Sequence, residues 1–279
     1  MPPAFAPRST AKMSVDEKTK TLLYAHHGFG KTTQCKFYQE HYGPGFIFSG
    51  EGGLKSLVGT DIDYLAFSSW DGQHDPASDV YSFKGIVRMT QSDEFKAMGY
   101  KWIAIDSLTE LSDLCLRHFE KEVEAERLRN NKDKKDGFAV WNQYNAALIG
   151  ALKWLRDLDM HVLVTALAKE EEDANGVLHY WPMMQGKGVM KQVPGIFDNV
   201  FCGVRSAEPD PATGRPRIKR FFITEEANGW HGKSRDPLHR TEAIENTDRM
   251  TDIFKKMNMS DEQYREHMKA KEKDNAVAE

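Results

Sequence analysis

The sequence has little cysteine and no long hydrophobic run. Its cysteines form no CxxC pair and have no histidine at metal-ligand spacing: Cys35, Cys115 and Cys202. Such scattered thiols predict structural roles in a reducing compartment and no zinc site. The apolar runs are far too short to cross a bilayer, and the polar N-terminal stretch lacks the apolar core of an export signal. We therefore expect a cytoplasmic chain without a membrane partner.

The sequence also lacks an excess of positive charge. Its 38 Lys and Arg side chains are set against 42 Asp and Glu side chains, which gives a formal net charge of −4. This balance argues against a generally basic coat for nucleic acid and leaves local basic patches open. The length of 279 residues and the absence of internal repeats predict one large domain. We expect a flexible arm over 1–19, the domain over 20–258 and a charged tail over 259–279.

Stretches typical of strands alternate with stretches of helical period. The expected strands are 21–24, 45–48, 63–70, 102–105 and 161–168, and the expected helices begin near 31, 80, 108 and 141. This alternation predicts an α/β fold with a mostly parallel sheet and helices on both faces. Two later strands, 199–205 and 217–225, predict an antiparallel hairpin at the sheet edge.

Two stretches show no sustained apolar period. Residues 120–137 are highly charged and predict a solvated, mobile segment. Residues 169–198 predict either a long functional loop or a short hairpin. The segment after residue 248 has a helical pattern.

A glycine-containing loop separates the first strand from the first helix. Gly28 and Gly30 let the backbone curl so that its N–H groups and the helix N-terminus bind a polyphosphate. Lys31 would reach the β- and γ-phosphates, and the Thr32 hydroxyl would hold Mg²⁺. Ala25 replaces the first glycine of the motif, and its small size leaves the loop formable; the alternative is a chance match. The expected ATP-binding residues are His27, Gly28, Phe29, Gly30, Lys31, Thr32 and Thr33.

Two acidic residues follow expected strands. Asp106 ends the buried strand 102–105, which we expect next to the loop strand, and would be the second Mg²⁺ anchor. Glu51 ends the strand 45–48 and would polarise the attacking water. Asp106 would otherwise simply cap the helix that begins at Ser107, and Glu51 would be a solvated turn residue.

These motifs, in this order, resemble the core of RecA-fold ATPases. The residues that carry the resemblance are GFGKTT, FIFSGEGGLKSL and KWIAIDSLTEL. In that family a Glu ending the second strand activates water, and an Asp-Ser ends the Walker B strand. HVLVTALAKEEED, PMMQGKGVMKQVPGIFDNV and HGKSRDPL further resemble phage-encoded RecA-like ATPases of the Sak type, which are minimal recombinases associated with single-strand annealing.

This resemblance implies a Mg-dependent ATPase that acts on single-stranded DNA in phage recombination or annealing, in the host cytoplasm. A single-strand DNA-binding protein is among the partners it implies. Ala166 and Leu167 depart from RecA, which has a polar Asn-Gln sensor of the γ-phosphate at this point. Coupling between nucleotide and the following loop would then use Lys169 or Glu170.

In RecA-type proteins, DNA is held by loops after the Walker B helix and after the next strand. Cations beside aromatic rings occur in both corresponding segments, as sequence-tolerant single-strand binding requires. The candidate residues are Lys132, Lys134 and Lys135 in the first and Trp181, Lys187 and Lys191 in the second. The alternative is a solvated charge run and a self-packing loop, because acidic residues dilute the positive field.

Two cations, Lys233 and Arg235, flank one residue after the last expected strand. Residues two apart in an extended segment project from the same side. The spacing resembles the KxR element that RecA-like hexameric helicases insert into a neighbour's nucleotide site, which implies a homo-oligomer with nucleotide at the subunit interface. A surface turn with solvated cations is the alternative.

Two other functions remain compatible with the sequence. A P-loop kinase acting on a small molecule would need an arginine-rich lid and an acceptor pocket, and neither is visible. A nucleotide-gated binding module with little turnover is favoured by Ala25 and by the missing polar sensor.

Overall fold

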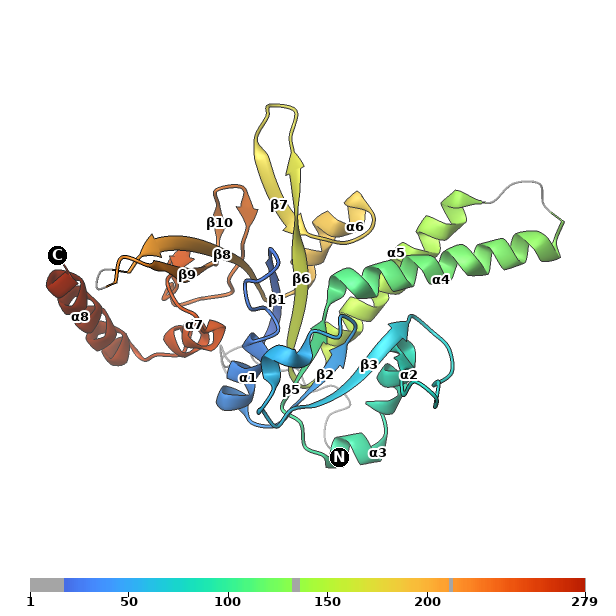
Figure 1. The fold of residues 1–279 in the computed structure, drawn as a ribbon, viewed down its shortest axis with the longest axis horizontal. Coiled ribbons are helices and arrows are strands. Elements are labelled where there is room, and N and C mark those ends of the chain that lie inside the picture. The colour runs from blue at the N-terminus through green and yellow to red at the C-terminus, as the bar shows by residue number, and fades with distance from the viewer. Residues whose placement is uncertain (1–17, 132–135, 211–212, 279) are drawn as a thin grey trace, which may run out of the picture.

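The computed structural model describes residues 18–131, 136–210 and 213–278 (Figure 1). The strands are β1 (Lys20–Ala25), β2 (Gly45–Ser49), β3 (Asp63–Ser69), β4 (Tyr81–Ser82), β5 (Trp102–Asp106), β6 (His161–Glu172), β7 (Leu178–Pro182), β8 (Asn199–Pro209), β9 (Pro216–Ile223), β10 (Glu226–Ala227), β11 (Trp230–His231) and β12 (Ile244–Glu245). The helices are α1 (Gln34–Tyr42), α2 (Phe83–Met89), α3 (Asp93–Ala97), α4 (Leu108–Arg129), α5 (Gly137–Asp157), α6 (Lys187–Gln192), α7 (Met250–Met257) and α8 (Asp261–Ala278), with short 3₁₀ turns at Leu54–Leu57 and Val193–Ile196.

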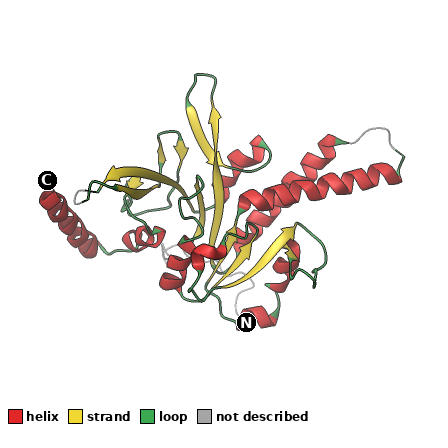
Figure 2. Ribbon diagram, in the orientation of Figure 1, coloured by secondary structure: helices red, strands yellow, loops and turns green. Residues whose placement is uncertain are grey.

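The central sheet is mostly parallel, with the strand order β12-β9-β8-β1-β6-β5-β2-β3-β4. Strands β1, β2 and β5 are buried along their whole length, as expected of apolar strands covered on both faces. Helices lie on both sides of the sheet (Figure 2). The predicted α/β class is therefore confirmed, including the antiparallel hairpin β8–β9 near one edge.

Two apolar clusters fill the two faces of the sheet. On one face, Leu22 and Tyr24 of β1 belong to a cluster with side chains of α4 and α5. On the other, Leu23 of β1 belongs to a cluster with Tyr38 of α1 and Phe254 of α7. The strict alternation along β1 fixes which side chains face each layer.

One expected strand neighbour is wrong. The strand ending in Asp106, β5, does not lie next to the loop strand β1, because β6 is inserted between them and pairs in parallel with both. At the level of Asp106, β6 carries Thr165, whose small side chain lets the carboxylate reach Thr32 beyond it. The Thr165 hydroxyl donates to Asp106 Oδ1 over 2.5 Å.

Two expected element boundaries also need correction. Helix α1 begins at Gln34 rather than Lys31, because the three preceding residues form tighter turns in which the Gln34 N–H donates to the Lys31 carbonyl. The charged stretch expected to be mobile is helical as far as Arg129, since α4 packs against α5 and buries Val123. Of the two alternatives for residues 169–198, the structure has the hairpin, formed by β6 and β7 and followed by α6.

Two elements project from the sheet in Figure 1. The α4–α5 pair extends sideways, away from the sheet. The β6–β7 hairpin rises beyond the ends of the parallel strands. Both lie where the sequence predicted nucleic-acid loops. Lys132, Lys134 and Lys135 lie outside the described residues, as does most of the expected N-terminal arm.

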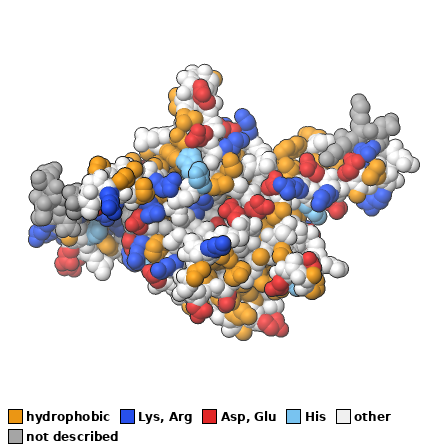
Figure 3. Space-filling view, in the orientation of Figure 1, with side chains coloured by type: hydrophobic (Ala, Val, Ile, Leu, Met, Phe, Trp, Pro, Cys, Tyr) orange, Lys and Arg blue, Asp and Glu red, His pale blue; other side chains and the backbone are white. Residues whose placement is uncertain are grey.

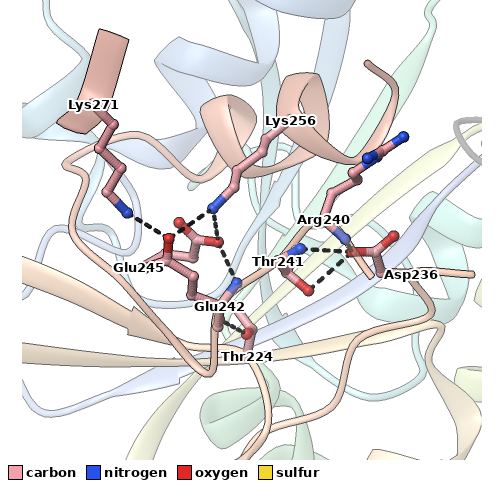
Figure 4. A network of polar contacts seen from close by, with 8 residues as sticks. All are labelled: Thr224, Asp236, Arg240, Thr241, Glu242, Glu245, Lys256 and Lys271. Carbon is pink, nitrogen blue, oxygen red and sulfur yellow. Dashed lines mark hydrogen bonds and ion pairs between the residues drawn. The ribbon is translucent and has the colours of Figure 1, made fainter. Parts of the chain in front are cut away.

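The C-terminal helices are joined to the sheet edge by a network of ion pairs (Figure 4). Lys256 of α7 is buried, and its Nζ lies 2.7 Å from Glu245 Oε1 and 3.6 Å from Glu242 Oε1. Lys271 of α8 lies 2.5 Å from the same Glu242 oxygen. The charged tail 259–279 is therefore helical from Asp261 to Ala278 and makes contact with the domain. None of the described helices is both long and apolar enough to cross a membrane.

Candidate nucleotide site

The phosphate loop joins the end of β1 to α1, at the carboxyl end of the parallel strands. Gly28 and Gly30 have φ angles of 73° and 101°, in the left-handed region that only glycine adopts without strain. Positive φ angles on either side of Phe29 are typical of loops whose backbone N–H groups converge on an anion. His27, at its rim, is exposed.

Phe29 fixes this loop on the sheet. Its side chain is 1% exposed and meets Phe222 of β9 edge to face, with ring centroids 5.3 Å apart. A Cβ on Gly203 of β8 would lie 2.6 Å from the Phe29 ring, so only glycine fits beneath it. Of the expected nucleotide contacts, Phe29 can therefore supply its backbone but not its side chain.

Lys31 lies inside the loop and is largely buried. Its Nζ donates to the Ala25 carbonyl over 3.3 Å and to the His26 carbonyl over 3.5 Å. Burial lowers the pKa of the Lys31 ammonium, while the carboxylates of Glu51 and Asp106 act in the opposite direction. Because these backbone acceptors are neutral, phosphate oxygens arriving in the loop would be stronger partners.

Thr32 and Asp106 make the candidate metal site. The Thr32 hydroxyl donates to Asp106 Oδ2 over 2.7 Å, and Asp106 is 1% exposed. Hydroxyl and carboxylate oxygens are ligands that Mg²⁺ prefers, usually with several retained waters and substrate phosphates. The residues therefore fit a magnesium ion. The alternative role of Asp106 as a helix cap does not hold, because the Ser107 side chain accepts the Glu110 N–H and caps α4.

Glu51 lies beside this pair. It follows β2, is exposed, and accepts a hydrogen bond from the Ser107 hydroxyl. The N–H groups of Gly50 and Glu51 donate to the Asp106 carbonyl over 2.7 and 3.4 Å, which ties the two strand ends together. The structure thus brings Lys31, Thr32, Asp106 and Glu51 to one edge of the sheet.

Two arginines that the sequence reading did not identify contact the phosphate loop. Arg205 Nη1 donates to the Gly28 carbonyl over 3.1 Å, and Arg220 Nε donates to the Phe29 carbonyl over 2.8 Å. They come from β8 and β9, where they are direct partners across the ladder. A sequence signal existed, because the predicted hairpin places a cation on each strand, but its register was not predicted.

Lys233 and Arg235 lie at the opposite end of the loop strand. Lys233 bridges Val200, which pairs with Leu22 early in β1. Lys233 Nζ donates to the Phe197 carbonyl over 2.7 Å, and Arg235 Nη1 lies 2.8 Å from Asp198 Oδ1. Both side chains therefore reach the same segment. They do not join the phosphate loop of their own chain, and their predicted role in a neighbour's site stays a prediction.

The projecting hairpin carries an aromatic and histidine cluster at its base. Trp181 of β7 stacks on His231 at 3.7 Å, and Lys191 Nζ lies 5.5 Å from the Trp181 ring centroid. Lys187 Nζ lies 3.5 Å from a Glu171 carboxylate oxygen. Figure 3 shows histidine side chains grouped at this level of the surface. Trp181 and both lysines are thus partly engaged within the chain.

The same cluster contacts the phosphate loop. His26 Nε2 lies 3.6 Å from Glu170 Oε1, and the His26 ring meets Tyr180 and Trp230 edge to face. Tyr180 and Trp230 are themselves stacked with centroids 4.2 Å apart. Glu170, one of the two residues expected to couple the loop to the hairpin, therefore lies against the loop, whereas Lys169 lies near Glu171.

A glycine-curled loop opening a helix, a buried lysine and a strand-end hydroxyl–carboxylate pair together define a P-loop ATPase domain. The chain belongs to the AAA_24 family, described as an AAA domain, which matches residues 17–236. No curated protein matches it. The crystal structure of flagellar accessory protein FlaH from Methanocaldococcus jannaschii is similar, with 9% identity and a TM-score of 0.34 over 74% of this chain and 77% of FlaH.

Proposed function

We propose that the protein is a Mg-dependent ATPase that acts on single-stranded DNA. The observation that carries the ATPase part is the Thr32–Asp106 hydrogen bond of 2.7 Å beside the buried Lys31. In this mechanism Lys31 and the loop N–H groups hold the terminal phosphates, and Thr32 and Asp106 hold the ion. Bound Mg²⁺ would neutralise charge on the phosphate oxygens.

Glu51 acts on the water in this proposal. Its carboxylate takes a proton from the attacking water while the new O–P bond forms at the γ-phosphorus. The bond between the γ-phosphorus and the bridging oxygen then breaks, which releases ADP and phosphate. The Ser107 hydroxyl, which donates to Glu51, keeps the carboxylate on the side of the sheet where the loop lies.

Formation of ADP from Mg·ATP by the full chain tests this proposal. Lys31→Ala is expected to abolish nucleotide binding or hydrolysis, because it removes the only lysine inside the loop. Lys36→Ala, at an exposed position on α1 just beyond the loop, is the matched control and should keep full activity. Equal rates for wild type and Lys31→Ala would overturn the ATPase assignment. ADP formation without any phosphate acceptor also argues against a small-molecule kinase.

The DNA part of the proposal is supported by the projecting hairpin and by the resemblance to Sak-type recombinases in phage annealing. Trp181 and Lys191 offer a ring and a cation near the hairpin base. Trp181→Ala is expected to weaken binding of single-stranded oligonucleotides by about 1–3 kcal/mol, the usual cost of one lost base stack. Lys132, Lys134 and Lys135, replaced together, should flatten the salt dependence of binding. If both variants bind single-stranded oligonucleotides as tightly as wild type, the DNA part of the proposal is wrong.

A binding module with little turnover is the second candidate. The Ser107 hydroxyl occupies one Glu51 oxygen, so part of the acceptor capacity needed to take a proton from water is already used. Slow hydrolysis with tight ATP binding, unaffected by Glu51→Gln, would favour this alternative.

A further inference from the structure

Arg205 and Arg220 repel each other across the β8–β9 hairpin unless other groups offset their positive charges. They are directly opposite in the antiparallel ladder of β8 and β9, so their side chains share one face of the sheet. Like charges in directly opposite positions destabilise a sheet. Arg220 is balanced by Asp248 at 3.3 Å, whereas no ion pair joins Arg205 to a carboxylate among the described residues.

The face that carries these arginines is the face that supports the phosphate loop. Gly203, two residues before Arg205, lies under the Phe29 ring, and Phe222, two residues after Arg220, contacts that ring. The period of two along a strand therefore directs both guanidinium groups towards the loop. Their hydrogen bonds to the carbonyls of Gly28 and Phe29 follow from this placement.

The hydrogen bonds to these two carbonyls also fix the orientation of the peptide groups that contain them. The peptide bonds after Gly28 and Phe29 are trans, so each C=O points away from the N–H of the next residue. A carbonyl fixed towards an arginine on the outside of the loop therefore turns the N–H of Phe29, and likewise that of Gly30, to the inside. A flip of the Phe29–Gly30 peptide changes ψ of Phe29 and φ of Gly30. Because glycine permits either sign of φ, this peptide could otherwise flip at little cost.

We propose that Arg205 and Arg220 are positioning residues of the nucleotide site, which orient the N–H groups of Phe29 and Gly30 towards the bound polyphosphate. This inference rests on the proposed ATP binding. Arg205 and Arg220 act on the loop from the outside through its carbonyls, and Lys31 acts from the inside. The target is a chain of phosphates, since oriented backbone N–H groups recognise oxyanions whatever base is attached.

The test is calorimetric titration of the full chain with Mg·ATP and, separately, with inorganic triphosphate. Arg205→Met and Arg220→Met keep an unbranched side chain and remove its donors, and each is expected to weaken the binding of both ligands about tenfold to a hundredfold. Arg220→Gln places an uncharged N–H donor near the position of Arg220 Nε, which donates to the Phe29 carbonyl, and should recover most of the loss at this residue. Arg217→Met is the matched control, because Arg217 lies on β9 on the opposite face and is exposed.

The outcomes separate this inference from the function on which it rests. If wild type and Arg217→Met bind neither ligand, ATP binding and the arginine role both fall. If they bind and the Met variants bind equally well, only the arginine role falls. An Arg220→Gln variant as weak as Arg220→Met would assign the effect to charge and overturn peptide orientation. Unfolding temperatures without ligand identify any variant that fails to fold, and Arg220→Gln then decides.

Discussion

The imidazole of His26, in the phosphate loop, lies 3.6 Å from the carboxylate of Glu170, on the strand that runs into the projecting hairpin. This contact joins the nucleotide site to the element proposed to meet DNA. It also supplies a polar group near the position where RecA has its Asn-Gln sensor and this chain has Ala166 and Leu167. The phosphate loop and the hairpin therefore share a polar contact.

From this contact we expect Glu170→Gln to uncouple the two sites. The variant keeps the size of the side chain and removes its charge, so DNA should no longer change the rate of ATP hydrolysis, while the rate without DNA stays near that of wild type. Glu172→Gln, near the hairpin turn, is the control. A variant that DNA stimulates as strongly as wild type would show that His26 and Glu170 do not carry the coupling.

Glu51→Gln should keep ATP affinity and lose turnover. The amide has the shape of the carboxylate but cannot take a proton from water, and losing such a group costs roughly 10²-fold or more in rate. Steady-state ADP release and equilibrium ATP binding, measured on the same preparation, separate the two effects. Hydrolysis at the wild-type rate would mean that another group activates the water.

Gly203→Ala should destabilise the domain and weaken ATP binding together. The added Cβ would lie 2.6 Å from the Phe29 ring, and such overpacking typically costs about 1–3 kcal/mol of unfolding free energy. Gly150→Ala, on α5 with open space around its Cβ position, should instead stabilise by up to about 1 kcal/mol. Urea unfolding of both variants checks the opposite signs, and a stable Gly203→Ala protein would contradict the anchoring role of Phe29.

The stability of the domain should fall as the solution is acidified, in part because of His161. Burial lowers the pKa of His161 from 6.5 to about 4, with the nearby charge of Lys20 acting in the same direction. Between these two values the folded state binds fewer protons than the unfolded state, so the unfolding free energy decreases as pH falls through this window. His161→Phe keeps a ring for stacking on Tyr42 and removes the titration. Its unfolding free energy should depend less on pH than that of wild type; identical pH profiles would rule His161 out.

Arg235→Ala should lose about 10³-fold in turnover while it still binds ATP, if Arg235 acts in a neighbouring chain. Arg235 cannot reach the phosphate loop of its own chain, because it pairs with Asp198 at the opposite end of β1 from that loop. Hydrolysis per chain should therefore rise with protein concentration. Mixing Arg235→Ala with Lys31→Ala should restore some activity through one intact composite site. No recovery at any ratio, with mixed assembly verified, would exclude action in trans.

Local signals explain how far the sequence predicted this site. The loop glycines, Lys31 and Thr32 are close in the chain, and Asp106 and Glu51 end strands whose apolar runs are unmistakable. In a mostly parallel sheet those ends meet at one edge, so the residues could be grouped without knowing the strand order. The insertion of β6 beside β1 could not be predicted, because strand order depends on contacts between distant segments.

The arginine contacts were missed for a related reason. Arg205 is 177 residues from Gly28 in the chain, and Arg220 is 191 residues from Phe29. Recognising them required both the register of β8 on β9 and the position of that hairpin beside β1. The polarity of residues 120–131 led to the wrong expectation of a solvated, mobile segment. Packing against α5 keeps α4 helical as far as Arg129.

Strand β6 is continuous over 12 residues, from the middle of the sheet to the turn of the hairpin. Thr165 contacts the Asp106 carboxylate near its centre, and Glu172 lies at its far end. At about 3.3 Å per residue, these positions are roughly 23 Å apart. An extended backbone is already near its full length and cannot stretch to absorb a displacement. The candidate metal site and the hairpin turn therefore lie on one unbroken strand, and a displacement at Thr165 would be transmitted along β6 to the hairpin.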